Sequence, residues 1–193
     1  MRKTVALTAL VGLLAFSGMA QVKEYYVEAG FGAGVGFTSL DGTDFSKLIT
    51  GSVSDFAIEF AIKGGMGLFD GLPLYATIEY GGIGHMFFDN RDYIQFNSYL
   101  LGPGLMYYPI PQLQLAASVG YSFTANSAND GIVDNSSSGI AWNLSAGYEI
   151  GEGRRRALVG LKYINTYNEL DKTKVTMNSS AVCVFVRYVW RNR

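Results

Sequence analysis

The stretch from Ala29 to Phe37 reads AGFGAGVGF, and glycines at this density raise the question of a phosphate-binding loop. A dinucleotide-binding loop needs the pattern G-x-G-x-x-G, because its third glycine stands where a helix begins and packs closely on its strand. Val35 occupies the place of that third glycine, and no Gly-Lys-Ser/Thr follows as a P-loop requires. The glycines fall instead at every second position from Gly30 to Gly36. This spacing argues against phosphate chemistry.

The residue types that bind metals or form disulfides are scarce in this chain. There is one histidine, His85, and one cysteine, Cys183. A zinc site usually takes three or four His, Cys or carboxylate ligands, so we predict no metal centre. A single cysteine also allows no internal disulfide.

Alternation of apolar with small or polar residues is the dominant pattern of the chain. Every odd-numbered residue from Tyr25 to Phe37 is apolar, and the residues between are Tyr, Glu or Gly. This period of two describes a long β-strand with one apolar face. The pattern recurs in seven further segments: 55–68, 74–88, 93–108, 113–124, 140–150, 156–163 and 179–190. In segment 93–108, the run Gly102-Pro103-Gly104 predicts a bulge, because proline cannot donate to a strand ladder; the facing of this strand stays open.

The direction of the apolar face decides between two kinds of barrel. A soluble lipocalin-like barrel has an apolar interior and a heavily charged exterior, whereas a membrane barrel has an apolar exterior and a polar or small-residue lumen. Only 16% of the residues are charged, which is too few to cover a soluble exterior. Tyrosines and Trp190 near the strand ends suit interfacial aromatic girdles. We therefore predict an all-β fold, an eight-stranded antiparallel up-and-down transmembrane β-barrel.

The first twenty residues predict export from the cytoplasm. Arg2 and Lys3 precede an apolar run from Val5 to Phe16, and Gly18-Met19-Ala20 forms a small-residue cleavage site. The run is shorter than the ~20 residues that span a bilayer as a helix. We expect residues 1–20 to be a signal peptide and residues 21–193 to be the barrel domain. Without Arg2 and Lys3 the chain is modestly acidic, which argues against a nucleic-acid partner.

The motif LGPGLMYYP from Leu101 to Pro109 and the ending Tyr188-x-Trp190 add to these features. Together they resemble the family of small eight-stranded outer-membrane barrels, the OmpA/OmpX-like group, and also the OmpW-like barrels, over residues 21–193. The resemblance implies an integral protein of the bacterial outer membrane with periplasmic termini. It implies two partners, the outer-membrane lipid and the barrel-assembly machinery, which reads the C-terminal strand. One departure is that Arg191-Asn192-Arg193 follow Trp190, where such barrels usually end on an aromatic residue.

Some barrels of this size are lipid A deacylases or palmitoyltransferases that use a histidine near a serine and a carboxylate. Phe87 stands where the deacylase His-x-Ser motif has its serine, and the sequence offers no evident carboxylate beside His85. A catalytic triad built on His85 would therefore lack a nucleophile for the histidine to activate. We predict no catalytic residue, no cofactor and no enzyme activity, with His85 at the rim or in the lumen.

Charged residues on the polar strand faces are expected to pair inside the lumen. An eight-stranded barrel has an interior just wide enough for side chains, and charges buried there must be paired. Lys63 is expected to reach Glu28 or Glu79, Arg187 to approach Glu28, and Lys162 to pair with Glu149. The predicted network comprises Glu28, Glu59, Lys63, Glu79, Glu149, Lys162 and Arg187; the alternative is that several are individually hydrated.

The segments between strands predict the topology and the function. Short turns fall at 69–73, 109–112 and 151–155, and outer loops at 38–54, 89–92, 126–138 and 165–174. The first loop is unusually apolar, which suggests contact with a host or matrix ligand or a cover over the barrel mouth; these contact candidates are Leu40, Phe45, Leu48 and Ile49. We expect a structural and surface-interaction, adhesin-like role through the loops. The alternative, implied by the OmpW-like resemblance, is a narrow channel for small or hydrophobic molecules.

Overall fold

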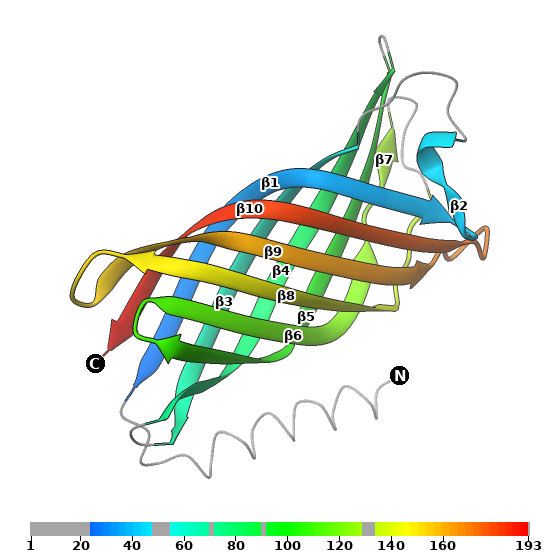
Figure 1. Cartoon of the computed structure of the whole chain (residues 1–193). Helices are drawn as coiled ribbons and strands as arrows, with labels where there is room; N and C mark the ends of the chain where they lie inside the picture. The colour runs from blue at the N-terminus through cyan, green and yellow to red at the C-terminus, as the bar shows by residue number, and fades with distance from the viewer. Residues whose placement is uncertain (1–23, 48–54, 70–71, 90–91, 129–133, 193) are drawn as a thin grey trace, which may run out of the picture.

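The protein is a single antiparallel sheet closed into a barrel, as predicted (Figure 1). The computed structural model describes residues 24–47, 55–69, 72–89, 92–128 and 134–192. The predicted signal peptide, residues 1–20, lies outside them. Eight long strands form the wall: β1(Tyr25–Leu40), β3(Phe56–Phe69), β4(Leu72–Asp89), β5(Asp92–Ile110), β6(Leu113–Thr124), β8(Gly139–Ile150), β9(Arg155–Glu169) and β10(Thr176–Asn192). The short strands β2(Thr43–Asp44) and β7(Ser127–Ala128) and the 3-10 helix η1(Phe45–Lys47) complete the described elements.

Pairing of β1 with β10 closes the wall, and the register around it sets the tilt of the strands. Following register partners once round the barrel from Gly30 leads back to β1 at Leu40, ten residues further along, through Ala61, Gly81, Leu100, Ser122, Gly139, Asn168 and Met177. Such a stagger requires strands tilted by about 35–45° to the barrel axis. Side chains that are level along the axis therefore come from staggered strand positions.

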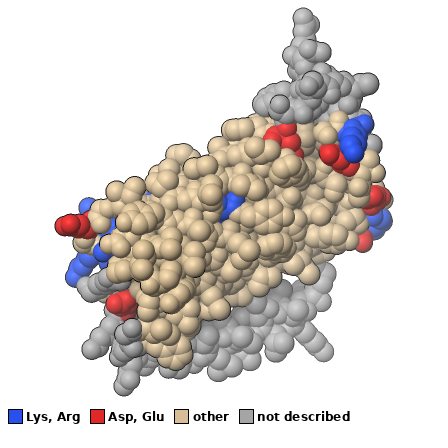
Figure 2. Space-filling model, viewed as in Figure 1, with Lys and Arg blue, Asp and Glu red and all other residues tan. Residues whose placement is uncertain are grey.

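Each strand buries every second side chain in the lumen and exposes the others on the outer wall. In β1, Tyr26 and Glu28 are buried, whereas Phe31 is 71% exposed. On the face that Figure 2 shows, the wall is nearly free of charged side chains, which gather toward the two ends of the barrel. The apolar face thus points outward, as the membrane-barrel prediction requires. Among the described residues, no helix is long and apolar enough to cross a membrane.

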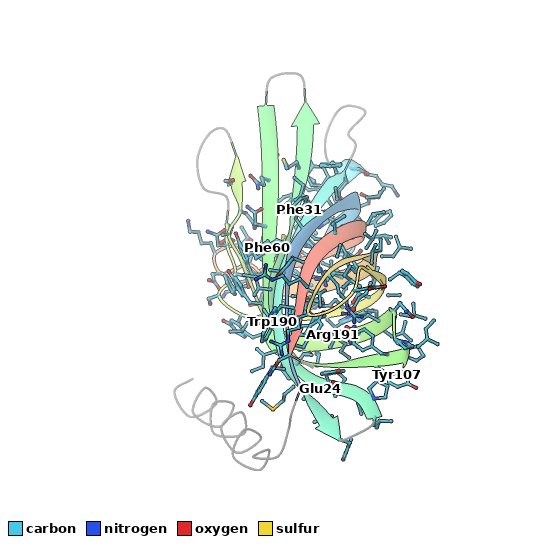
Figure 3. All side chains as sticks on the ribbon, turned by 90° about the vertical axis from the view of Figure 1, so that its left-hand side faces the viewer. Glu24, Phe31, Phe60, Tyr107, Trp190 and Arg191 are labelled. Atoms are coloured by element: carbon cyan, nitrogen blue, oxygen red, sulfur yellow. The ribbon has the colours of Figure 1, made fainter. Side chains whose placement is uncertain are left out.

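The two ends of the barrel differ in the length of the segments that they carry. Glu24, Trp190 and Arg191 lie near the same end, where both chain termini enter the barrel (Figure 3). We call this the terminal end; it also carries the connections between β3 and β4, β5 and β6, and β8 and β9. The opposite loop end carries β2, η1, β7 and the connections after β4, β6 and β9.

Some sequence-based predictions about the strands were wrong. Residues 38–40, expected in a loop, continue β1, and residues 109–110, expected in a turn, continue β5. Gly102-Pro103-Gly104 makes no bulge, because β4 and β5 keep one register through these residues; the irregularity of β5 lies between Tyr107 and Ile110. Residues 165–169, expected in a loop, continue β9. Their alternation is carried by polar residues such as Asn165 and Thr166, so the apolar period that marked the other strands is lost there.

The buried side chains of β5 show which of its residues face the lumen, a question that the sequence left open. Phe96, Leu100, Met106 and Tyr108 are buried, so the even-numbered residues of β5 point inward. Its odd-numbered residues, including Leu101 and Leu105, form the outer wall.

Candidate functional site

Six charged side chains form a closed ring of ion pairs across the lumen. Glu28 lies 3.3 Å from Lys63 and 2.7 Å from Arg187. Glu79 lies 3.5 Å from Lys63 and 2.9 Å from Lys162. Glu59 lies 3.2 Å from Lys162 and 3.0 Å from Arg187. All six side chains are fully buried, each contacts two of opposite sign, and the three carboxylates balance the three cations.

The ion-pair ring is made of contacts between neighbouring strands and of contacts that cross the barrel. Lys63 is the register partner of Glu28 on one side and of Glu79 on the other, so these three residues form a row on β1, β3 and β4. Lys63 Nζ lies at ion-pair distance from both carboxylates without the alignment of a hydrogen bond. Lys162 comes from β9, which pairs with neither β3 nor β4, and hydrogen-bonds Glu59 and Glu79. Its side chain therefore ties two facing walls together.

Two neutral side chains and the aromatic side chain of Phe185 also contact the charged residues of the ion-pair ring. Ser118 Oγ donates a hydrogen bond of 2.6 Å to Glu79, and Asn143 Nδ2 donates one of 3.2 Å to the other oxygen of that carboxylate. The Arg187 guanidinium lies 4.0 Å from the centroid of the Phe185 ring. Donors on every side of a buried carboxylate offset part of the cost of removing its charge from water.

Glu149, the seventh residue of the predicted network, lies outside the ring. Its expected partner was Lys162, but the register pairs Lys162 with Ser145 and Glu149 with Leu158, nearer the terminal end. Glu149 instead accepts hydrogen bonds from Arg156 at 3.1 Å, from Tyr108 at 2.5 Å and from Arg191.

Glu149 anchors a second polar cluster, at the terminal end. The Arg191 guanidinium lies 4.1 Å from the centroid of the Tyr108 ring, and Gln114 Nε2 lies within hydrogen-bond distance of the hydroxyls of Tyr108 and Tyr26 and of Glu28. Sequence reasoning missed Arg191, although it continues the inward alternation of Arg187 and Val189 on β10.

A layer of polar side chains crosses the lumen on the loop side of the ring. His85, Ser98, Ser122, Asn168 and Ser179 are fully buried, and each has a side-chain polar atom without a hydrogen-bond partner in the described part of the chain. His85, Asn168 and Ser179 are nearer the loop end than the ring residues on the same strands. Ser98 is nearer the loop end than Gly102, the register partner of Glu79, and Ser122 is nearer to it than Ser118, which contacts Glu79. Buried polar groups of this kind are usually satisfied by water or a ligand.

His85 has a carboxylate neighbour that the sequence did not indicate. His85 Nδ1 lies 2.9 Å from Asp55 Oδ1, although the two residues are 30 positions apart. The antiparallel pairing of β3 with β4 brings them together on diagonal positions. A Cβ at Gly36 would overlap the His85 ring, so the glycine of β1 makes room for this pair. In the described residues, no group of three or more His, Cys, Asp and Glu side chains is placed to hold a metal ion.

An apolar cluster covers the polar layer at the loop end. Phe45 of η1 packs edge-on against Phe87 and Phe96, with ring centroids 4.8 Å and 4.7 Å apart, and Leu170 and Met177 complete the cluster. Phe45 is only 8% exposed and offers little of its own surface to a ligand; its role as a contact candidate stays a prediction.

The alternative expectation, that the apolar side chains of the first loop cover the barrel mouth, agrees with these contacts. Leu40 is partly buried and packs on the same cluster. Leu48 and Ile49 lie outside the described residues.

Hydrogen bonds connect the loop segments around this cluster. The Asp134 carboxylate accepts from the backbone N–H groups of Lys172 and Thr173, the latter at 2.6 Å, and from the Thr173 hydroxyl. Desolvation opposes ionisation of this group, but the bonds from Thr173 and Lys172 hold the pKa of Asp134 below its usual value. Asp171 accepts from the backbone N–H and the hydroxyl of Ser137. The segment after β6 is thus tied to the segment after β9.

Closure, strand number and apolar exterior together define an outer-membrane type of β-barrel. No family profile matches the chain, and no curated protein sequence does. Neisserial surface protein A (NspA) shares the fold with a TM-score of 0.54 at 14% identity, over 84% of this chain and 95% of that one. Ail, the attachment invasion locus protein of Yersinia pestis, does so with a TM-score of 0.53 at 12% identity, over 85% of this chain and 97% of that one. The chain has the fold of the small eight-stranded outer-membrane β-barrels.

Proposed function

We propose that this protein is an integral barrel of the bacterial outer membrane that acts as a structural and surface-interaction protein through its loop end. The observation that carries the proposal is that the lumen is blocked at two levels, by the ion-pair ring and by the apolar cluster around Phe45. A barrel closed in this way offers its surfaces for function, because its interior is occupied by its own side chains.

The ring argues against the alternative of a narrow channel. The side chain of Lys162 crosses the lumen. A solute that passed through the barrel would have to break the buried ion pairs of Lys162 with Glu59 and Glu79. Breaking one member out of a buried ion pair costs several kcal/mol. The apolar cluster adds a barrier to water and ions at the loop end. The proposed function likewise involves no catalysis.

The outer wall supports the membrane location. Leu144, Val184 and Leu161 are each more than half exposed in the middle of their strands, which is favourable only when lipid covers them. We place the loop end outside and both termini in the periplasm, and we expect the barrel-assembly machinery to recognise β10, whose outward row includes Tyr188 and Trp190.

The loop end is acidic, which limits the class of partner. The segments 38–55, 89–92, 126–138 and 165–174 carry nine Asp or Glu residues and four Lys or Arg residues. The structure of Ail was solved with the heparin analogue sucrose octasulfate, a polyanion. Like charges would repel such a ligand here, so we propose a neutral or cationic surface on a host cell or in its matrix as the partner.

Two measurements test this function. Refolded protein in planar bilayers is expected to give no stable conductance steps. Bacteria that display the protein should adhere to cultured epithelial cells more than bacteria without it, and replacing residues 126–138 with a short turn should abolish the difference. Stable conductance steps would favour the channel instead. Adhesion no greater than that of non-displaying bacteria would overturn the surface-interaction role.

A further inference from the structure

Five aromatic rings form a continuous patch on the outer wall of β3 to β6. The rings of Tyr99 and Phe123 are stacked, with centroids 4.9 Å apart and planes 15° apart. Phe60 packs edge-on against Tyr80 at 5.7 Å and Tyr99 at 6.2 Å, and Tyr121 lies 6.3 Å from Phe123. All five occupy outward positions of their strands. Because the rings support each other, little side-chain entropy remains to be lost on binding.

A glycine on β4 lets two of these rings pack directly onto the backbone. A Cβ at Gly82 would lie 3.0 Å from both Phe60 Cε1 and Tyr99 Cδ1. Any larger residue would lift the two rings away from the sheet. The patch is therefore a built surface and not a chance gathering of aromatic side chains.

Two amide side chains lie next to this patch on its loop side. Gln95 Nε2 donates a hydrogen bond of 2.8 Å to Asn97 Oδ1, and Asn97 Nδ2 donates one of 2.8 Å to the carbonyl of Ala125. A Cβ at Gly84 would lie 2.8 Å from Asn97 Oδ1, so the glycine provides the space in which the amide lies. Each NH₂ group retains a second N–H, and the Gln95 carbonyl makes no hydrogen bond to the described residues.

The same combination of amides beside aromatic rings occurs a second time, on β8 to β10. Asn165 Nδ2 donates a hydrogen bond of 2.8 Å to Asn178 Oδ1 on the outer wall. The register partner of Asn165 is Trp142, whose ring lies 5.2 Å from that of Tyr163. In both places the amides are nearer the loop end and the rings nearer the middle of the wall.

We propose that these two places bind a membrane glycolipid with a neutral, hydroxylated head group. Its acyl chain packs on the rings, and its hydroxyl groups exchange hydrogen bonds with the free donors and acceptors of the amides. A neutral head group fits the first place because the described outward side chains of β3 to β6 include no Lys, Arg, Asp or Glu. An ionic head group would find no counter-charge there. At the second place the outward Glu169 of β9 is already paired with Lys174. The inference rests on the proposed membrane location.

The test uses two probes that share an acyl chain and differ in head group. Wild-type protein folded in a short polyoxyethylene detergent is mixed with dodecyl maltoside and dodecylphosphocholine in equal amounts and examined by native mass spectrometry. We expect retention of up to two dodecyl maltoside molecules in preference to dodecylphosphocholine. Free maltose, the control without a chain, should not be retained.

Substitutions at Gln95, Asn97 and Tyr99 test whether the maltoside binds at the aromatic patch of β3 to β6. The double variant Gln95→Leu/Asn97→Leu should weaken maltoside binding at one site by about tenfold, the effect of losing two hydrogen bonds. Tyr99→Leu, which keeps the amides, serves if the double variant does not fold. Tyr188→Leu at the terminal end is the matched control and should bind as wild type does.

Three outcomes would overturn the inference: equal retention of the two amphiphiles, unchanged retention in folded forms of both site variants, or retention of maltose alone. These failures are distinct from failure of the proposed function. A chain that does not fold into lipid bilayers at all would refute the membrane location, whereas a folded barrel without head-group preference would refute only the glycolipid site.

Discussion

Lys162 is the residue on which the closure of the lumen depends most. It is the cation of the ring that reaches across the barrel, and it hydrogen-bonds two carboxylates. Burying charges costs free energy that pairing only offsets, so the ring is weak evidence for high stability. Each charge is tolerable while its partners are present, and removal of one side chain leaves its two neighbours with one partner each and the ring with an unbalanced buried charge.

Substitution of Lys162 tests this dependence at the level of one side chain. Lys162→Met leaves Glu59 with one cationic partner and Glu79 with one, and should lower the free energy of unfolding by about 3–5 kcal/mol. Adding Glu79→Gln should recover part of the loss. Lys174→Met, which removes a pair with Glu169 exposed at 68% and 62%, is the control and should cost about 1 kcal/mol or less. Urea unfolding in lipid vesicles measures all three, and similar losses for Lys162→Met and Lys174→Met would mean that water reaches the ring.

At the scale of elements, the loop segments are organised by a few hydrogen bonds around Asp134. The lowered pKa of this carboxyl fixes the sign of its pH dependence. A group whose pKa is lower in the folded state stabilises that state when it is ionised, above its ordinary value of 3.8. The contribution is lost as the pH falls through the lowered pKa, so the loop contacts are insensitive to pH in the neutral range.

Removal of the carboxylate tests the connection between these two loop segments. Asp134→Ala should speed hydrogen exchange of the Lys172 and Thr173 amides by about tenfold at neutral pH, since both lose their acceptor. Exchange in β9 should not change. Asp171→Asn is the control, because its contacts are with Ser137 and not with those two amides. Unchanged exchange in Asp134→Ala would show that other contacts hold the segment.

The strand facing makes a prediction at the same scale. Val119 lies in the middle of the outward row of β6 and is 54% exposed, so Val119→Arg places a charge near the bilayer midplane. We expect a cost of roughly 2–4 kcal/mol for folding into bilayers, against roughly 0–1 kcal/mol for Asn178→Arg near the loop end of the wall. Equal costs at the two positions would show that Val119 does not face lipid.

The strands could be predicted from the sequence where one face is apolar, and less well where it is not. The period of two gave the inward position of Glu28, Lys63 and Glu79 directly. It could not give the partners of Lys162, because they lie across the barrel on β3 and β4. The contact expected with Glu149 on the adjacent strand fails because the register places Ser145 beside Lys162. Phe45 was recognised as unusual, but its burial depends on Phe87 and Phe96 from a hairpin far along the chain.

At the scale of the whole molecule, the lumen is a stack of polar and apolar layers. From the terminal end these are the Glu149 cluster, the ion-pair ring, the apolar cluster of Ala57, Ile83, Ile164, Ala181 and Cys183, the polar layer with His85, and the apolar cluster around Phe45. An apolar cluster separates the ion-pair ring from the polar layer with His85, and on the face that Figure 2 shows the charged side chains gather at the two ends of the barrel. The two ends are therefore the surfaces that differ most from the lipid-facing wall, and their orientation decides which one meets the environment.

Cysteine labelling of intact cells determines this orientation. Cys183 is the only cysteine and is buried in the lumen, so an added surface cysteine gives a clean signal. Lys172→Cys, at the exposed loop end, should react with a membrane-impermeant maleimide on whole cells. Glu152→Cys, in the exposed connection between β8 and β9, should react only after the outer membrane is permeabilised, because it lies at the end that carries both termini. Wild-type protein controls for reaction at Cys183. If Glu152→Cys were labelled and Lys172→Cys protected on whole cells, the barrel would have the opposite orientation in the membrane. The surface-interaction role would then belong to the arginine-rich terminal end.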